Sequence, residues 1–100
     1  SGYPDCRTNF IASMEKSINL GTKTGSIGHK IKILAPLIHL SKKEIILLGK
    51  KNEADYSYSY SCYNGDPVPC GYCDSCKLRA AAFSEAGIKD DYLARISKNQ

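Results

Sequence analysis

Long hydrophobic runs are missing from this sequence of 100 residues. No apolar stretch approaches the roughly 20 residues that a transmembrane helix needs. The first residues carry neither a basic region nor an apolar core, so no signal peptide is expected. There is no internal repeat, and a composition of 42% hydrophobic and 24% charged residues excludes collagen, mucin-like stalks and wholesale disorder. The sequence therefore predicts one cytoplasmic globular piece, no larger than a single domain.

A concentrated charge of one sign is also missing. The formal net charge is only +4, and the 14 lysines and arginines are spread along the chain. This distribution allows an anionic ligand but does not require a nucleic acid. The glycines at 21, 25 and 28 fit neither GxxxxGK[ST] nor GxGxxG, so residues 21–30 are predicted to form a mobile loop rather than a phosphate site.

Cysteine is what the sequence has in excess. There are five cysteines, an odd number, and four of them follow the pattern Cys62-x7-Cys70-x2-Cys73-x2-Cys76. A secreted disulfide framework favours an even number and a signal peptide, and buried apolar cysteines would not cluster in this way. Four thiolates at these spacings predict one tetrahedral zinc ion in a closed, structural site. An iron–sulfur cluster is the alternative metal group.

The residues between the cysteines suit a metal loop over 62–76. Gly71 permits a tight turn between the second and third cysteines, and the turn at 64–67 lets the chain double back. The last two cysteines fall at the start of a predicted helix, where free N–H groups favour thiolates. Zinc and four thiolates carry a net charge of −2, which we expect Lys77 and Arg79 to offset in part.

Periodicity and capping signals predict mainly helical structure. A Ser41–Glu44 capping box starts one short helix, and Tyr56–Ser61 alternates as a strand would, which would place three tyrosines on one face. The predicted helices cover residues 5–21, with Asp5 as N-cap, then the segment after Ser41, residues 74–86, and a segment from Asp90 or Asp91 through Ile96; residues 31–34 are expected to be extended and 97–100 a frayed tail.

The tyrosine ladder supports a second interpretation of function. Tyr56, Tyr58 and Tyr60 on one face could stack nucleobases, as expected of a free-standing zinc-binding RNA or protein interaction module. Residues 53–66, however, contain three acidic residues and no lysine or arginine, which weakens this alternative.

Several stretches together resemble the C-terminal half of the 7-cyano-7-deazaguanine synthases. The residues that carry the resemblance are Tyr3-Pro4-Asp5-Cys6-Arg7, Ala35-Pro36-Leu37-Ile38, Ser41-Lys42-x-Glu44-Ile45, Ser61-Cys62-Tyr63 and Cys70-Gly71-x-Cys73-Asp74-Ser75-Cys76-x-Leu78-Arg79. They occur in the family's order and span about positions 1 to 90. Tyr60 stands where the family would be expected to have tryptophan.

The resemblance implies an α/β fold, the Rossmann-like ATP pyrophosphatase (PP-loop) fold, of which this piece is mainly helical with a short extended segment. It implies a ligase that converts 7-carboxy-7-deazaguanine, ammonia and ATP into a nitrile for queuosine or archaeosine biosynthesis. It also implies that Cys62, Cys70, Cys73 and Cys76 bind zinc. The reaction would proceed by adenylation of the carboxylate, attack by ammonia, and a second activation that leaves the nitrile.

The family's ATP-binding Ser-Gly-Gly-x-Asp-Ser motif is absent from this sequence. Residues 1–100 are therefore expected to be one C-terminal segment of a larger domain, inactive alone, with ATP and Mg²⁺ bound mainly by the preceding half. No catalytic residue is identified. Candidates for contacts with the small-molecule substrate are Asp5, Cys6, Arg7 and Lys42, although Cys6 could equally be a small core residue. We expect no membrane association and no direct contact with a nucleic acid. A homodimer is possible.

Overall fold

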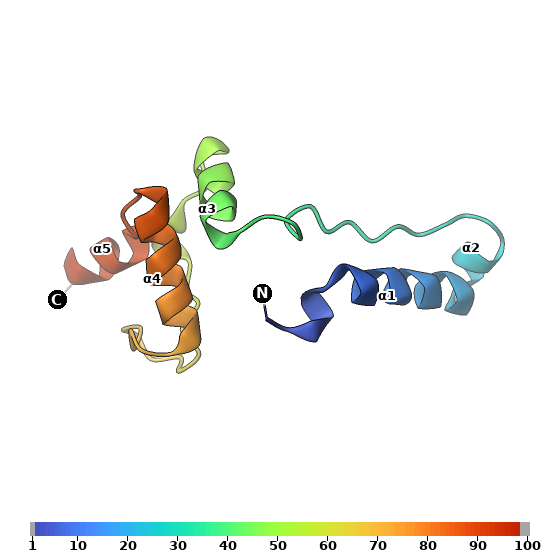
Figure 1. The fold of residues 1–100 in the computed structure, drawn as a ribbon, viewed down its shortest axis with the longest axis horizontal. Coiled ribbons are helices and arrows are strands. Elements are labelled where there is room, and N and C mark those ends of the chain that lie inside the picture. Colours follow the sequence, from blue (N-terminus) through green and yellow to red (C-terminus); the bar gives the residue numbers. More distant parts are fainter. Residues whose placement is uncertain (1, 99–100) are drawn as a thin grey trace. The chain divides into compact units, whose positions relative to one another are not determined.

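The computed structural model describes residues 2–98, and the chain divides into two compact units, one up to His39 and the other from Leu40. Within residues 2–98 every regular element is helical and no strand is present. No helix among these residues is both long enough and apolar enough to cross a membrane. In chain order the elements are η1 (Pro4–Cys6), α1 (Thr8–Gly21), α2 (Lys23–Ser26), α3 (Lys42–Lys51), η2 (Tyr56–Tyr58), α4 (Asp74–Ala86) and α5 (Asp91–Lys98) (Figure 1).

The first unit consists of α1 and a chain segment that returns along it (Figure 1). The Asn19 side chain accepts a hydrogen bond from the Ile31 N–H at 2.7 Å and donates one to the Ile31 carbonyl at 2.8 Å. The Glu15 carboxylate accepts from the Ile33 N–H at 2.8 Å. Side chains of α1 thus supply the backbone partners that a neighbouring strand would otherwise provide.

The start of α1 differs from the prediction. The helix begins at Thr8 rather than near Asp5, because the backbone of Arg7 is extended and residues Pro4–Cys6 form a separate 3-10 turn. Asp5 is therefore not the N-cap of α1. The predicted loop over 21–30 also contains a short helix, α2, whose N-cap Thr22 accepts a hydrogen bond from the Gly25 N–H at 3.1 Å.

The core of the second unit lies between α3 and α4. Ile46 of α3 packs with Ala82 and Phe83 of α4. The predicted capping box is confirmed, since the Ser41 Oγ accepts from the Glu44 N–H at 3.1 Å and the Glu44 carboxylate accepts from the Ser41 N–H at 2.9 Å. The hydrogen bond from the Ser41 backbone, together with the Ser41 side chain, lowers the pKa of the Glu44 carboxyl below its usual range.

The bounds of α4 agree with the prediction. The helix covers Asp74–Ala86 and ends at Gly87, which has a left-handed φ of 68° that glycine adopts without strain. The last helix, α5, extends further than predicted, because Ser97 and Lys98 are part of it. The remainder of the predicted frayed tail, residues 99–100, lies outside the described residues.

The strand predicted over Tyr56–Ser61 is wrong. Residues Tyr56–Tyr58 form the 3-10 helix η2 instead, because the Asp55 carboxylate accepts hydrogen bonds from both the N–H and the hydroxyl of Ser57, at 2.9 and 2.6 Å. This side-chain turn competes with an extended backbone, and the described residues offer no neighbouring strand to pair with.

The three tyrosines consequently do not form one stacking face. The Tyr56 hydroxyl donates to the Ile46 carbonyl at 2.9 Å and its ring meets Phe83 edge-on. The Tyr60 ring packs instead against a residue of α5, and the Tyr58 side chain is 75% exposed.

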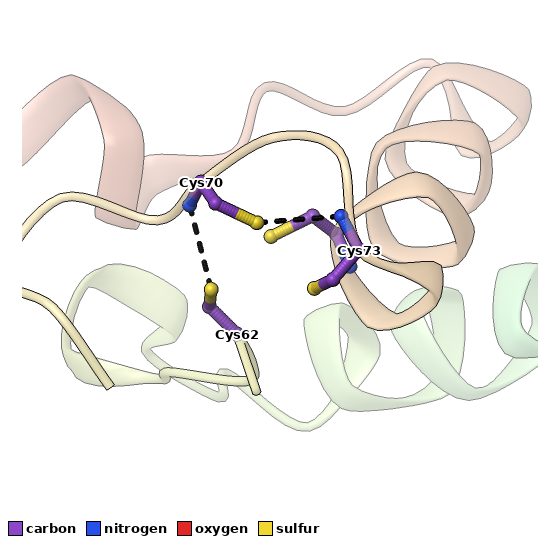
Figure 2. A group of neighbouring side chains, drawn as sticks. Cys62, Cys70 and Cys73 are labelled. Atoms are coloured by element: carbon purple, nitrogen blue, oxygen red, sulfur yellow. Dashed lines mark hydrogen bonds between the residues drawn. The ribbon is translucent and has the colours of Figure 1, made fainter. Parts of the chain in front are cut away.

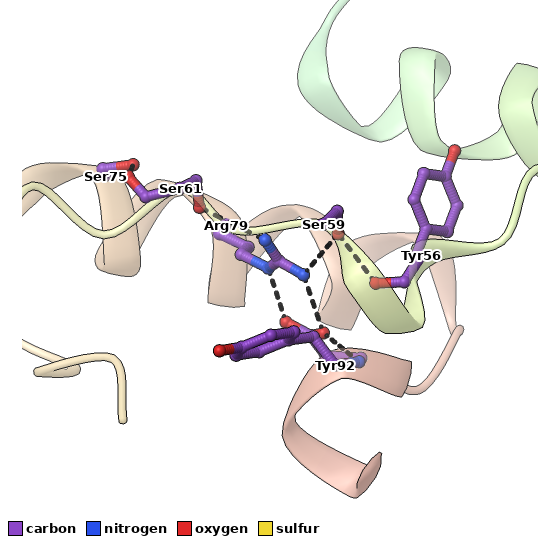
Figure 3. Close-up of polar contacts among 7 residues, drawn as sticks. Tyr56, Ser59, Ser61, Ser75, Arg79 and Tyr92 are labelled. Atoms are coloured by element: carbon purple, nitrogen blue, oxygen red, sulfur yellow. Dashed lines mark hydrogen bonds and ion pairs between the residues drawn. The ribbon is translucent and has the colours of Figure 1, made fainter. Parts of the chain in front are cut away.

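The chain segment that follows η2 is tied to α4 and α5 by one arginine (Figure 3). The Arg79 guanidinium donates to the Asp90 carboxylate through two nitrogens, at 2.7 and 3.0 Å. It also donates to the hydroxyls of Ser59 and Ser61, at 2.8 and 3.3 Å. Both charged side chains are largely buried, with 15% and 11% of their surface exposed. The planar fork of an arginine suits this arrangement, and a lysine could not reproduce it.

Gly49 provides a test of the packing between α3 and η2. A Cβ atom at this position would lie 1.9 Å from the Tyr56 hydroxyl. We expect Gly49→Ala to lower the unfolding temperature, because overpacking costs about 1–3 kcal/mol and outweighs the gain of about 1 kcal/mol in helix propensity. Thermal unfolding followed by circular dichroism measures the effect.

Gly21→Ala is the matched control, because nothing lies within 4 Å of the added Cβ. It should leave the melting temperature unchanged or raise it. Combining Gly49→Ala with Tyr56→Phe should cost less than the sum of the two single changes. Fully additive effects would show that the hydroxyl is not the obstacle.

Candidate metal centre

The four clustered cysteines converge on one point in the second unit (Figure 2). The sulfur atoms of Cys62, Cys70, Cys73 and Cys76 all lie within 4.8 Å of one another. A tetrahedral zinc site with Zn–S bonds of about 2.3 Å has sulfur–sulfur distances of about 3.8 Å. The four sulfurs therefore need only small side-chain movements to surround one ion. The predicted ligand set is brought together as expected.

Backbone N–H groups point at the sulfurs. Cys70 Sγ accepts from the N–H groups of Tyr72 and Cys73, at 3.4 and 3.3 Å, and Cys62 Sγ accepts from the Cys70 N–H at 3.4 Å. The tight turn predicted at Gly71 is confirmed, and its φ of 78° lies in the left-handed region that glycine adopts without strain. These donors stabilise negative charge on sulfur, as a thiolate site requires.

The start of α4 is built from the metal loop itself. Cys73 is the N-cap of α4, and its sulfur accepts a hydrogen bond from the Cys76 N–H at 3.4 Å. The sulfur thus takes the place that a serine or aspartate oxygen usually fills. The third and fourth cysteines lie at the positive end of the helix, as the sequence predicted.

Three of the four thiols have pKa values that differ from the usual value of a cysteine. Hydrogen bonds from the backbone of Cys70 and Asn64 lower the pKa of Cys62 to about 6. Hydrogen bonds from the backbone of Tyr63 and Cys76 lower the pKa of Cys73. For Cys76, a hydrogen bond from the Gly71 backbone is outweighed by burial and by the three neighbouring thiols, which raise its pKa to about 12.

This pattern fits a site for a cation. Thiolates are favoured singly by the backbone donors, but four of them cannot be negative together at this distance without a positive ion between them. Soft sulfur donors in a tetrahedral set suit zinc or an iron–sulfur cluster. The residues present therefore fit a metal ion.

One of the two side chains predicted to offset the charge of the metal site is bound elsewhere. Arg79, expected to offset the charge of the metal site, is bound to Asp90 instead. Asp90 was not identified from the sequence, because nothing in a run of residues shows which of several acidic groups an arginine will meet. Ser75 links the cysteine cluster to the chain segment that Arg79 contacts. It directly precedes Cys76, and the Ser75 hydroxyl donates to the Ser61 carbonyl at 2.6 Å.

The proposed substrate contacts lie in both units. Asp5 and Cys6 are exposed neighbours in η1, where the Cys6 thiol donates to the Asp5 carboxylate at 3.8 Å, and Arg7 is the exposed N-cap of α1. Cys6 is exposed among the described residues, so the first unit by itself does not bury it. Lys42 is the first residue of α3, in the other unit, and is also exposed.

Comparison with known proteins assigns the chain to a family. Residues 1–87 match the family model of the queuosine biosynthesis protein QueC. The chain belongs to the QueC family. A 7-cyano-7-deazaguanine synthase of Coxiella burnetii is 54% identical over 96% of this chain. Synthases of Nostoc punctiforme and Acetivibrio thermocellus are each 53% identical, over 90% and 95% of this chain.

The similarity covers less of the relatives than of this chain. The chain spans 44% of the length of the Coxiella synthase and 40% of the Nostoc synthase. The resemblance seen in the sequence is confirmed by the family match, and four of the chain's five cysteines are the ones that the fold gathers.

A cysteine inside the cluster and one outside it can be compared directly. We expect Cys73→Ser to abolish metal binding and lower the melting temperature, because the variant loses a ligand while the serine hydroxyl can still cap α4. Cys6→Ser, at an exposed site in the other unit, should keep both. Metal content by elemental analysis and thermal unfolding check this. Full metal content in Cys73→Ser would contradict the four-thiolate site.

Proposed function

We propose that this chain is the metal-binding C-terminal part of a 7-cyano-7-deazaguanine synthase. The whole enzyme would convert 7-carboxy-7-deazaguanine, ammonia and ATP into the nitrile, in the cytoplasm, for a modified nucleoside of tRNA. The observation that carries the proposal is the convergence of four cysteines in a chain that matches the QueC family over residues 1–87. Relatives that are 7-cyano-7-deazaguanine synthases support this product.

The proposed metal is one structural zinc ion. Four cysteine ligands leave no position for water or substrate, which a catalytic zinc needs. Zinc bound there would supply positive charge and crosslink Cys62 to the start of α4. The chain's own contribution is to hold the loop 62–76 in shape with its backbone donors and to set the position of α4.

The remaining part of the proposed PP-loop domain would bind ATP with Mg²⁺. Exposed apolar side chains support a larger α/β domain. Phe10 and Met14 of α1, and Leu47 and Leu48 of α3, are each 40% exposed. Such side chains are usually covered in a complete domain. The Ser-Gly-Gly-x-Asp-Ser motif that the family uses for ATP does not occur in these 100 residues.

The chemistry assigns different tasks to the candidate residues. Carboxylate adenylation, displacement by ammonia and a second activation develop negative charge on carboxyl and phosphate oxygens. Arg7 and Lys42 carry positive charges suited to these oxygens, and Asp5 could accept hydrogen bonds from the deazaguanine ring. Adenylation already provides the activated carbon, so Cys6 is assigned to the pocket wall rather than to a covalent step.

The metal identity can be tested on the purified chain. We expect about one zinc per chain and no visible absorption, because zinc has a filled d shell. Elemental analysis and an absorption spectrum measure both. Iron together with acid-labile sulfide would instead identify a cluster.

The division of labour can be tested by activity. The 100-residue chain should produce no nitrile from 7-carboxy-7-deazaguanine, ammonia and ATP, whereas the full-length parent should. Product formation followed by mass spectrometry decides this. Turnover by the 100-residue chain alone would contradict the assignment of ATP binding to the rest of the enzyme.

Variants of Lys42 and Cys6 in the full-length parent test two different roles: a charge contact with the substrate and a covalent step. Lys42→Ala should reduce turnover about ten- to hundredfold, because a contact with an anion is worth about 1.5–3 kcal/mol. Zinc content and melting temperature should not change. Lys43→Ala, the adjacent exposed lysine, is the control and should be nearly neutral.

Cys6→Ala should retain most of the activity if the thiol only lines the pocket. A correctly folded but inactive Cys6→Ala enzyme, or a trapped thioester at Cys6, would show that the thiol is a nucleophile.

A further inference from the structure

The last helix packs against the η2 region and reaches the metal loop through Tyr92. α5 begins after residue 87, where the match to the family model ends, and its packing partner is the η2 region. Its buried residue, Tyr92, is 8% exposed. The contacts of α5 therefore give it a task other than filling the core.

Tyr92 holds both sides of the loop between the first two cysteines. Its ring packs edge-on against Tyr60, which lies two residues before Cys62, with 5.6 Å between ring centroids. Its hydroxyl donates to the Pro67 carbonyl at 3.1 Å, three residues before Cys70. Tyr60 itself also contacts this loop, since its hydroxyl donates to the Asp66 carbonyl at 2.5 Å.

Asp90 and Arg95 fix the chain segment that leads into the loop. Asp90 orients the Arg79 guanidinium, which in turn holds Ser61, the residue directly before Cys62 (Figure 3). Arg95 donates to the Ser57 carbonyl at 2.7 Å and lies over the Tyr58 ring at 4.4 Å. The approach to the first cysteine is thus anchored to α5 at several points.

Release of a metal ion from four thiolates begins when one ligand moves away. Cys62 and Cys70 are the ligands on the long connection, whereas Cys73 and Cys76 are tied to α4. If the chain around Cys62 and Cys70 cannot move, a departing sulfur returns before a second one leaves. Tyr92 of α5 contacts Tyr60, two residues before Cys62, and Pro67, three residues before Cys70.

We propose that α5 is a clasp on the metal loop and determines how slowly the metal ion leaves, with Tyr92 and Asp90 as positioning residues. This inference rests on the zinc site proposed above. It assigns the helix to metal retention, in addition to any contribution to stability. Removing a clasp contact should therefore change the site even where the fold is intact.

The experiment compares single variants of the zinc-loaded chain. Tyr92→Phe removes only the hydroxyl bond to Pro67, and Asp90→Asn keeps the shape but removes the charge that holds Arg79. We expect zinc transfer to 4-(2-pyridylazo)resorcinol, measured well below the melting temperature, to be about threefold to tenfold faster in Tyr92→Phe and faster still in Asp90→Asn. Tyr58→Phe is the matched control, because it removes the hydroxyl of a side chain that is 75% exposed and keeps the ring over which Arg95 lies, and it should release zinc at the wild-type rate.

Cobalt substitution provides a readout that overall stability alone does not move. The sulfur-to-cobalt charge-transfer and d–d bands should shift or broaden in Asp90→Asn but not in Tyr58→Phe. Wild-type release rates and unchanged cobalt bands in both variants would overturn the role of α5, even if their melting temperatures fall. A wild-type chain that binds neither zinc nor cobalt would instead contradict the proposed metal site, and with it this inference.

Discussion

The second unit depends on the ion pair between Arg79 and Asp90. Each partner is largely removed from water, so each would be costly to leave without the other. The pair is favourable here because the geometry is bidentate and because two serine hydroxyls and the Tyr92 N–H use the remaining donors and acceptors. Three chain segments meet at this point: α4, the segment between η2 and Cys62, and the start of α5.

Two sets of contacts hold the metal loop: those of Arg79 and those of the loop's own backbone. The loop contributes N–H groups to the sulfurs of Cys62 and Cys70, and Cys73 caps α4. Arg79 fixes the residue before Cys62. Because the arginine is bound to Asp90, the hydrogen-bond donors that meet the sulfurs of Cys62, Cys70 and Cys73 among the described residues are backbone N–H groups.

The first unit is held together mainly by polar contacts, because few of its apolar side chains are buried. Its returning segment has no strand beside it, and the backbone groups of Ile31 and Ile33 are satisfied by Asn19 and Glu15. Gly25 allows α2 to lie directly against α1, because an added Cβ would be 2.5 Å from the Cα of Asn19. Polar side chains of one helix thereby hold a chain segment to which no regular secondary structure is assigned.

The sequence by itself determined the features that depend on residues close together in the chain. The capping box at Ser41, the end of α4 at Gly87, the turn at Gly71 and the grouping of the four cysteines were all predictable, because each follows from local backbone geometry or short spacing in the sequence. The motifs also indicated the QueC family, which the comparisons confirmed. Alternation in Tyr56–Ser61 predicted a strand that does not form, because a strand needs a partner and Asp55 offers the backbone a local turn instead.

Only the tertiary structure decided which distant groups meet. Arg79 was expected near the metal ligands and binds Asp90, and Tyr92 reaches Pro67 across 25 residues of sequence. Nothing in the local sequence distinguishes Asp90 from the acidic residue beside it, since both carry the same charge. The choice is made when α4 and the chain before α5 pack together, because only then does a single carboxylate lie within hydrogen-bond distance of the guanidinium.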